Sequence, residues 1–415
     1  MPRGLPQRSS SSAWAPLREP LFRSLWIAAV ISYTGTWMQN VGAGWMMTQL
    51  TMSPLMVSLV QAATTLPVFL VILPAGALAD MVDRRRFLLI TQGWMVFAAG
   101  ALGLLTLRHA VTPWVLLGFT FLLGLGAVMN DPAWQAITPE IISPERHAPA
   151  VALNSVGFNV ARAVGPAMGG IVIAAAGSGV AFLLNAASFF GVIFFLYRWK
   201  RPSFESVENG RVRDALVAGF RYVRGAPIVR CVLIRTAAFS LGASSLLALL
   251  PIIARPHGAT GYGLLLGSFG LGALAGAAVL PQIRNSLSVD RVVAMAIVVF
   301  AAMTLLAGQI RSFGWLSLVL FTSGTAWIGI LACLNVAAQT MSPGWLRARM
   351  LSMYILVLQG GMALGSAAWG GLANKVGIPI TLICSAGALV LGLFTVRRYP
   401  LTSQELELAP SVVRD

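Results

Sequence analysis

The sequence contains few charged residues for its length. Only 10% of its 415 residues are charged, whereas 57% are hydrophobic. A soluble protein of this composition would expose large apolar patches, so the composition excludes an ordinary soluble domain. Cysteine is scarce as well. Cys231, Cys333 and Cys384 form no CxxC pair, which argues against a metal site or a disulfide framework.

Motifs for covalent catalysis and nucleotide hydrolysis are lacking. The sequence shows no Walker loop, no hydrolytic triad and no zinc-ligand spacing. It therefore predicts a protein that is not an enzyme, uses no cofactor or metal, and draws no energy from ATP. The first twenty residues contain no apolar core, so they do not form a cleavable signal peptide.

Long apolar segments are the main feature that is present. A bilayer core of about 30 Å requires roughly 20 apolar residues of helix. Such segments predict an all-α membrane protein with twelve transmembrane helices. Their approximate ranges are 22–49, 54–78, 87–107, 113–133, 152–175, 179–197, 229–253, 261–283, 290–309, 313–335, 350–374 and 378–396.

The basic residues predict the orientation of these spans. The net charge is +16, but the arginines lie in short loops rather than on one basic face, which excludes nucleic acid as a partner. Arg84, Arg85 and Arg86 mark one side, and most other basic residues fall on it. By the positive-inside rule that side is the cytoplasm, with both termini there. The outer loops hold only Arg108, Arg255, Arg311 and Lys375.

A long polar connection divides the spans into two sets of six. Its second part, 211–224, carries apolar residues on one helical face and arginines elsewhere, which predicts an amphipathic helix at the membrane interface. The predicted organisation is a cytoplasmic tail at 1–20, a six-helix half at 21–197, a cytoplasmic linker at 198–227, a second six-helix half at 228–396 and a cytoplasmic tail at 397–415.

The two halves resemble each other at an offset of 200 residues. Residues 75–77 and 275–277 are both Ala-Gly-Ala, and Gly165–Gly170 matches Gly365–Gly370 at its first and last glycines. Parallel six-helix repeats are a feature of one large transporter architecture, in which substrate binds between the halves near the membrane midplane.

The loop after the second span resembles the G-x-x-x-D-R-x-G-R-R motif of the major facilitator superfamily. Met81 and Asp83 depart from that motif, in place of a basic residue and a glycine. Other stretches, such as 36–39 and 132–135, resemble the branch that includes the bacterial enterobactin exporter. The resemblance covers nearly the whole chain and implies two pseudo-symmetric six-helix bundles that export drugs, siderophores or metabolites against protons. The matching motif positions are Gly76, Asp80, Arg84 and Arg85.

This motif implies a conformational lock at the inner side. In the family, the aspartate at the helix end binds the N-terminus of the neighbouring helix and an arginine, and the contact breaks when the cytoplasmic side opens. The attraction between the carboxylate, the arginine and the positive end of the helix dipole is sufficient to stabilise this contact. Asp80 would be that lock, with Asp83, Arg84 and Arg85 as its neighbours. The alternative is that these arginines fix only the topology.

The fifth span carries a pattern similar to the antiporter signature of exporters in this superfamily. Its positions are Gly165, Pro166, Gly169 and Gly170. Small residues at this spacing also allow two helices to approach closely, and Pro166 removes a backbone hydrogen bond, so close packing alone is the alternative explanation.

Asp131 and Arg162 are the charged residues expected within the membrane. An ionisable group at that depth is costly and often functional. We therefore expect Asp131 to bind a proton. The alternative is that it caps a helix that begins at Pro132. Arg162 requires a partner, and we expect Asp131 to provide it, either as a proton-sensitive pair or as a structural link between helices.

Polar and aromatic residues of the inner spans predict a substrate cavity between the halves. Each of them could instead hydrogen-bond between helices, and tryptophan also favours membrane interfaces. The candidates are Trp37, Gln39, Asn40, Asn159, Trp327, Asn335, Gln339 and Gln359.

The sequence as a whole predicts a secondary active transporter. We expect a monomer in contact with membrane lipids that exports a small molecule by alternating access in exchange for protons. Two alternatives remain. An uptake carrier can use the same fold, because a fold does not fix the direction of transport. A membrane receptor or scaffold without transport is the other.

Overall fold

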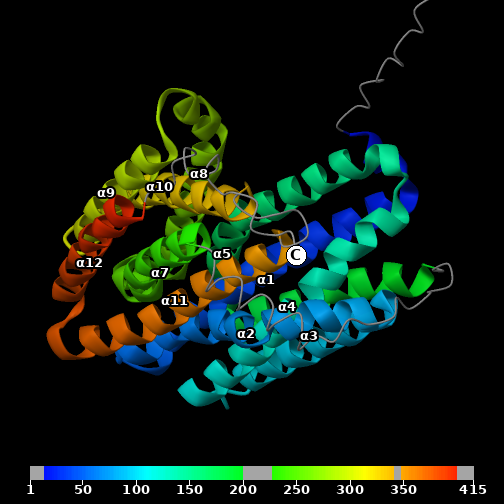
Figure 1. The fold of residues 1–415 in the computed structure, drawn as a ribbon. Coiled ribbons are helices and arrows are strands. Elements are labelled where there is room, and N and C mark those ends of the chain that lie inside the picture. Colours follow the sequence, from blue (N-terminus) through cyan, green and yellow to red (C-terminus); the bar gives the residue numbers. More distant parts are fainter. Residues whose placement is uncertain (1–13, 200–226, 341–346, 400–415) are drawn as a thin grey trace, which may run out of the picture.

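The computed structural model describes residues 14–199, 227–340 and 347–399, without the side chains of residues 73, 74, 76–81, 227, 228, 348 and 349. The predicted amphipathic helix at 211–224 lies outside these residues. The described ranges are helical (Figure 1). The long helices are α1 (Pro20–Leu50), α2 (Pro54–Met81), α3 (Arg84–Leu107), α4 (Pro113–Ile141), α5 (His147–Arg198), α7 (Pro227–Ile253), α8 (Gly258–Ser286), α9 (Val289–Ala307), α10 (Phe313–Thr340), α11 (Arg347–Val376) and α12 (Ile378–Arg398).

Helix α5 contains two of the predicted spans. Gly177 interrupts it with φ 83° and ψ 165°, where the chain turns back. The corresponding turn between α11 and α12 has Gly377 at φ 84° and ψ 164°. This conformation is essentially restricted to glycine, because it lies in the region of φ and ψ that excludes a Cβ atom. The paired turns show the internal repeat directly in the backbone.

The helices are long and apolar enough for a membrane protein. Ten of the described helices meet that description by length and composition, with α5 counted once. Helix α1, whose middle carries Gln39 and Asn40, is not one of them. The prediction of an all-α membrane protein with two six-helix bundles is confirmed.

Each half contains the same close helix pair. A Cβ atom on Gly165 of α5 would lie 2.6 Å from Cβ of Trp37 on α1, and one on Gly365 of α11 would lie 2.6 Å from the carbonyl oxygen of Leu241 on α7. Glycine at these positions lets the backbones approach. The equivalent contacts, 200 residues apart, show that α5 packs on α1 as α11 packs on α7.

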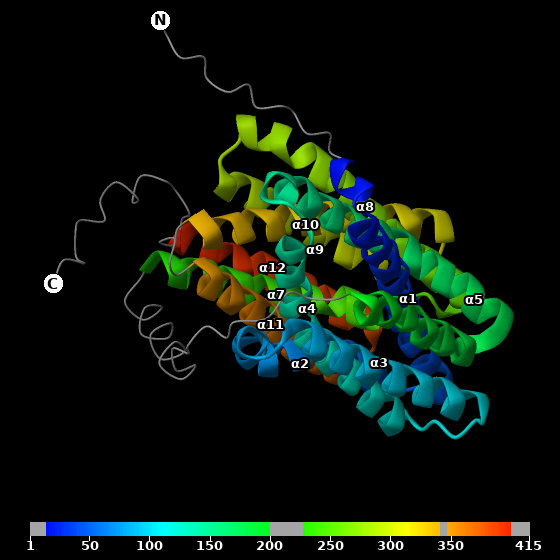
Figure 2. The same ribbon diagram turned by 90° about the vertical axis from the view of Figure 1, so that its right-hand side faces the viewer.

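The halves meet along two seams, α5 with α8 and α2 with α11 (Figures 1 and 2). A Cβ atom on Gly170 would lie 2.7 Å from the carbonyl oxygen of Ala259, so α5 and α8 are in backbone contact there. Ser53 Oγ lies 3.1 Å from Asn374 Oδ1 across the other seam. These contacts cluster at the end of the bundle where α1 turns into α2, which we call the Thr51 end. The opposite end, where α2 turns into α3, is the Arg84 end.

Toward the Arg84 end the halves separate. Val151 and Val156 in the first turns of α5 are exposed, and so are Leu274 and Val279 in the second part of α8. In Figure 1, α5 and α8 diverge from their contact toward the start of α5 and the end of α8. The halves are therefore in contact at the Thr51 end, whereas α5 and α8 lie apart toward the Arg84 end.

Candidate substrate-binding cavities

Two cavities lie between the halves and share part of their lining. The Arg162 cavity measures about 270 Å³, and the Asp131 cavity measures about 690 Å³. Asn40, Thr64 and Gln359 line both, so the two cavities are neighbours along one path. Each is named after the one charged residue that the described part of the chain contributes to its lining.

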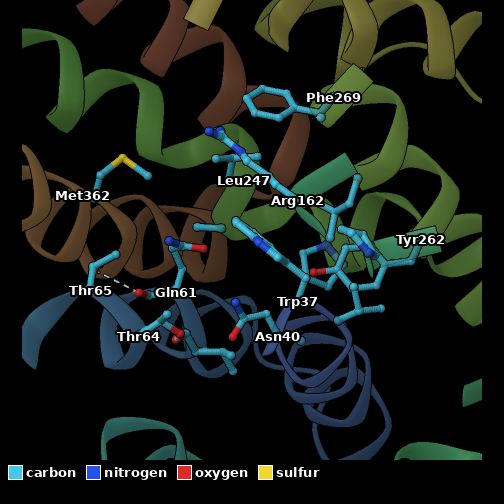
Figure 3. A pocket seen from close by; sticks show the side chains of 18 of the residues that line it. Trp37, Asn40, Gln61, Thr64, Thr65, Arg162, Leu247, Tyr262, Phe269 and Met362 are labelled. Atoms are coloured by element: carbon cyan, nitrogen blue, oxygen red, sulfur yellow. Dashed lines mark hydrogen bonds between the residues drawn. The ribbon is translucent and has the colours of Figure 1, made fainter. Parts of the chain in front are cut away.

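The Arg162 cavity combines one cation with several aromatic rings. Cζ of Arg162 lies 5.8 Å from the centre of the Trp37 ring, a cation–π contact. In Figure 3 the Arg162 side chain extends from α5 toward the region lined by Leu247 and Phe269. Asn40 and Thr64 lie on the other side of the cavity, together with other polar side chains of α1 and α2. Tyr262 and Trp327 complete the aromatic part of the lining.

Packing between α1 and α5 holds Arg162 in place. Tyr33 and Trp37 lie one helical turn apart on α1, as do Phe158 and Arg162 on α5. The ring of Phe158 lies edge-on to both aromatic side chains of α1, at 5.4 Å from Tyr33 and 6.4 Å from Trp37 between ring centres. Among the described residues, none forms a hydrogen bond or ion pair with the guanidinium of Arg162. Its charge therefore faces the cavity without a counter-charge.

The Asp131 cavity has a carboxylate and amide groups. Asp131 lies on α4, and its side chain is accessible from the cavity. Gln39 of α1 is only 4% exposed, and its Oε1 accepts a hydrogen bond of 3.2 Å from Asn185 Nδ2. Its Nε2 has no partner among the described residues. Buried polar atoms are usually paired, so this amide is available to a molecule in the cavity.

The alternative interpretation of Asp131 as a helix cap is wrong. Helix α4 runs from Pro113 to Ile141 without a break and includes Pro132 and Pro139. Proline in a helix interior removes one hydrogen bond, and neighbouring helices in a membrane bundle compensate for it. Asp131 therefore projects from the interior of a helix and does not cap one.

Asp131 and Arg162 do not form an ion pair with each other in this structure. Each lines its own cavity, and the shared residues Asn40, Thr64 and Gln359 lie in the linings of both. A direct pair in another conformation stays a prediction. The observed arrangement is one unpaired cation and one unpaired carboxylate along the same path.

The other cavity candidates divide into two groups. Trp37, Asn40, Trp327 and Gln359 line the Arg162 cavity, and Gln39 lines the Asp131 cavity. The remaining three form hydrogen bonds within their own helices and are absent from both linings: Gln339 Nε2 donates to Asn335 Oδ1 at 2.5 Å, and Asn159 Nδ2 donates to the carbonyl of Ser155 at 2.8 Å.

The described part of the Gly76 motif contacts its own half. Asp83 caps α3 by accepting a hydrogen bond of 2.8 Å from the backbone N–H of Arg86. Arg84 pairs with Glu140 of α4 at 2.9 Å. Arg85 donates to the carbonyl oxygens of Leu196 and Tyr197 at the end of α5, at 2.8 and 2.6 Å. Gly76 and Asp80 lie in α2, and the Asp80 side chain is outside the described residues.

The antiporter-like positions serve both helix contacts of α5. Gly165 and Gly169 face α1, where Cβ atoms on them would lie 2.6 and 2.9 Å from Trp37 and Met38. Pro166 and Gly170 face α8, in contact with Gly263. The pattern therefore lies on the seam between the halves and next to the Arg162 cavity, which Pro166 also lines.

Sequence reasoning missed two charged partners at the Arg84 end. Glu140 was not expected to pair with Arg84. Arg235 was given no partner either. It lies inside α7 with its side chain 2% exposed, and its Nη1 lies 2.5 Å from Asp290 Oδ1 at the start of α9. Both pairs join neighbouring spans at one membrane side. An acid and an arginine that flank spans on the same side are the only signal for them in the sequence.

This fold, with two similar six-helix halves and cavities between them, is the fold of transporters of the major facilitator superfamily. The match to a family model supports the same class. Residues 11–413 match the model described as transmembrane secretion effector, and the chain belongs to that family.

The curated relatives include proteins named as an exporter and as a transporter. The enterobactin exporter of Salmonella typhi is 26% identical over 391 residues, which cover 90% of this chain and 91% of the relative. The staphyloferrin A transporter of Staphylococcus aureus is 26% identical over 164 residues, 39% of this chain and 41% of the relative. Among solved structures, a bacterial homolog of the human lysosomal transporter spinster, inward-facing and unoccupied, has a TM-score of 0.68 at 14% identity and covers 92% of this chain and 98% of that one.

Proposed function

We propose that this protein exports a small molecule from the bacterial cytoplasm by alternating access, in exchange for protons. The observation that carries the proposal is the arrangement of the two halves around the cavities. The halves are in contact at the Thr51 end, and α5 and α8 lie apart toward the Arg84 end, which we take as the open end. An exporter requires such a state in order to load its substrate from the cytoplasm.

The distribution of arginine supports this orientation. Arg84, Arg85 and Arg86 lie at the open end, together with Arg146 and Arg198. The positive-inside rule assigns that end to the cytoplasm. The state described is then open to the cytoplasm, and the inner membrane is the location we propose, with both termini on the cytoplasmic side.

Asp131 is the group that we propose to bind the coupled proton. Among the described residues it is the only charged one in the lining of the larger cavity. Gln39 and Gln135 are among the polar side chains of the same lining. A carboxylate can be neutralised by a proton, whereas a guanidinium in a protein stays charged. Coupling would then act through the residues that both cavities share.

The Gly76 motif is proposed to stabilise the opposite state. When the Arg84 end closes, Asp80 at the end of α2 would bind the N-terminus of the neighbouring helix and an arginine. In the described state Arg84 and Arg85 are held by Glu140 and by the end of α5. Those contacts keep α3, α4 and α5 together as a rigid unit, so that the half can move as one body.

The relatives support a siderophore, drug or metabolite as substrate. The named exporter of enterobactin covers the chain almost completely. We propose no catalytic chemistry, and we propose a monomer that moves within membrane lipid. The α5 and α8 seam carries contacts that a change in tilt between the halves can make and break.

The experiment is mass spectrometry of the medium from cells that express the wild type, Asp131→Asn or the control Glu145→Gln at matched levels. Glu145 is an exposed acid outside the cavities. Export of a compound by the wild type and the control, but not by Asp131→Asn, supports both export and coupling. Equal export by all three proteins would support export but show that Asp131 does not couple export to protons. No difference from empty cells would favour the uptake or receptor alternative.

A further inference from the structure

We infer that the Arg162 cavity binds the acidic group of an organic anion with an aromatic body, and that this anion is the exported substrate. Only the claim that this anion is exported rests on the proposed function. The binding site itself follows from the charges, contacts and lining of the cavity.

The first step is the charge of Arg162. Among the described residues its guanidinium has no ion pair and no hydrogen bond, and its one contact is with the Trp37 ring. Removing a charge from water is costly unless a counter-charge compensates. A cation–π contact offsets only part of this cost. Because a guanidinium cannot lose its proton at physiological pH, only an anion can neutralise it.

The second step is the separation of the two charges. The carboxylate of Asp131 is in the lining of the other cavity, and none of the described residues that line the Arg162 cavity is acidic. A protein that needed Arg162 for structure alone would place a carboxylate beside it, as this chain does for Arg235 with Asp290. The contrast between these two arginines indicates that the position opposite Arg162 is kept for a ligand.

The third step is the rest of the lining. Trp37, Tyr262, Phe269 and Trp327 surround the cavity with ring surfaces, and Phe269 and Trp327 lie edge-to-face at 6.0 Å. Aromatic linings with a few convergent polar groups are typical of sites for small apolar molecules. At about 270 Å³ the cavity accepts a compact molecule. A planar acid can form two hydrogen bonds with the guanidinium while its ring packs on the aromatic wall.

The test measures binding to the full-length protein in phosphatidylcholine nanodiscs, with radiolabelled 2-naphthoate and its neutral counterpart 2-naphthamide. We expect the wild type to bind the acid at least tenfold more tightly than the amide. Arg162→Gln should lose that preference, roughly a tenfold to hundredfold loss for the acid, because a charged hydrogen-bond partner is removed. Arg162→Lys keeps the charge and should retain part of the preference. Arg108→Gln, at an exposed arginine, should bind like the wild type.

Three results would overturn the inference. They are equal binding of acid and amide by the wild type, binding of neither, and an unchanged preference in Arg162→Gln. If Arg162→Gln fails to fold, two measurements still test the anion site: binding by the Arg162→Lys variant, and the comparison of acid with amide in the wild type. Phosphatidylglycerol in the nanodiscs should leave naphthoate binding unchanged. Competition by this lipid would assign the site to a headgroup and overturn the assignment to a soluble substrate.

The binding assay and the export assay fail separately. If 2-naphthoate binds through Arg162 but cells release no compound, the anion site stands and the proposed export falls. If cells release a neutral or cationic compound and naphthoate does not bind, export stands and the anion site falls.

Discussion

The guanidinium of Arg162 on α5 lies 5.8 Å from the ring centre of Trp37 on α1. These two residues join the first and fifth spans at the cavity, and Gly165, one turn further along α5, lets the helices approach closely enough for the contact. The same pair of helices therefore builds the seam and presents the charge. A change in the packing of α1 on α5 would change the position of the charge as well.

Replacing Trp37 by leucine should weaken anion binding without removing it. A cation–π contact contributes about 0.5–2 kcal/mol, so binding of 2-naphthoate should fall by roughly twofold to thirtyfold. Trp114→Leu is the matched control, because Trp114 is 66% exposed and lines neither cavity. Equal losses in both variants would show that the effect comes from general destabilisation and not from Trp37.

The seam between α5 and α8 should control the closure of the Thr51 end. A Cβ atom on Gly263 would contact the carbonyl oxygen of Pro166 and lie 2.8 Å from Cα of Gly170. Both are backbone atoms, so Gly263→Val must push the helices apart and favour the state in which this end is open. Gly371→Val is the control, since a Cβ atom there meets nothing within 4 Å.

This opening can be measured with spin labels at positions 108 and 311. Both residues are exposed in loops at the Thr51 end, one in each half. Gly263→Val should add a population with a longer distance between the labels, and Gly371→Val should match the parent protein. An unchanged distance distribution in Gly263→Val would show that the contact between α5 and α8 does not control the opening of the Thr51 end.

The fold could be predicted from the sequence because hydropathy, basic loops and the repeat all act over long segments. Twelve spans follow from the apolar lengths, and the offset of 200 residues reappears in the turns at Gly177 and Gly377. The site could be predicted only in part. Whether a polar residue such as Asn335 faces a cavity or its own helix depends on a rotation of a few tens of degrees, which composition does not determine.

Asp131 and Arg162 show the same limit more clearly. Both were identified from their depth in the membrane, yet an ion pair was expected where the structure has two separate cavities. Pairing depends on which face of α4 and α5 each side chain occupies, and on packing against α1. Pro132 adds to the difficulty, because locally it indicates a helix start, whereas the surrounding bundle keeps α4 continuous.

The buried pair of Arg235 and Asp290 should contribute strongly to stability. Removing one partner leaves a buried charge alone, which costs about 3–5 kcal/mol. We therefore expect Asp290→Asn or Arg235→Met to lower the unfolding free energy of the C-terminal half. Nε and Nη2 of Arg235 have no partner among the described residues, so the pair is only partly satisfied, and Arg235→Met with Asp290→Leu should recover much of the loss.

Denaturation of the purified protein measures this, with Arg146→Gln as the control. Arg146 pairs with Glu19, and both side chains are partly exposed, so the loss there should stay below about 1 kcal/mol. A loss for Arg235→Met no larger than that of Arg146→Gln would contradict a structural role for the buried pair.

The two glycine turns should respond alike to substitution and opposite to a helical glycine. Gly177 and Gly377 have φ values of 83° and 84° with ψ near extended, a region that costs an alanine about 1–3 kcal/mol. Gly118 lies within α4 with open space around it, so Gly118→Ala should stabilise the protein by up to about 1 kcal/mol. Thermal unfolding of the three single variants measures the sign directly. Because a Cβ atom at Gly177 would meet no neighbour within 4 Å, a loss of stability there can come only from the backbone, and unchanged stability in Gly177→Ala would contradict the strained turn.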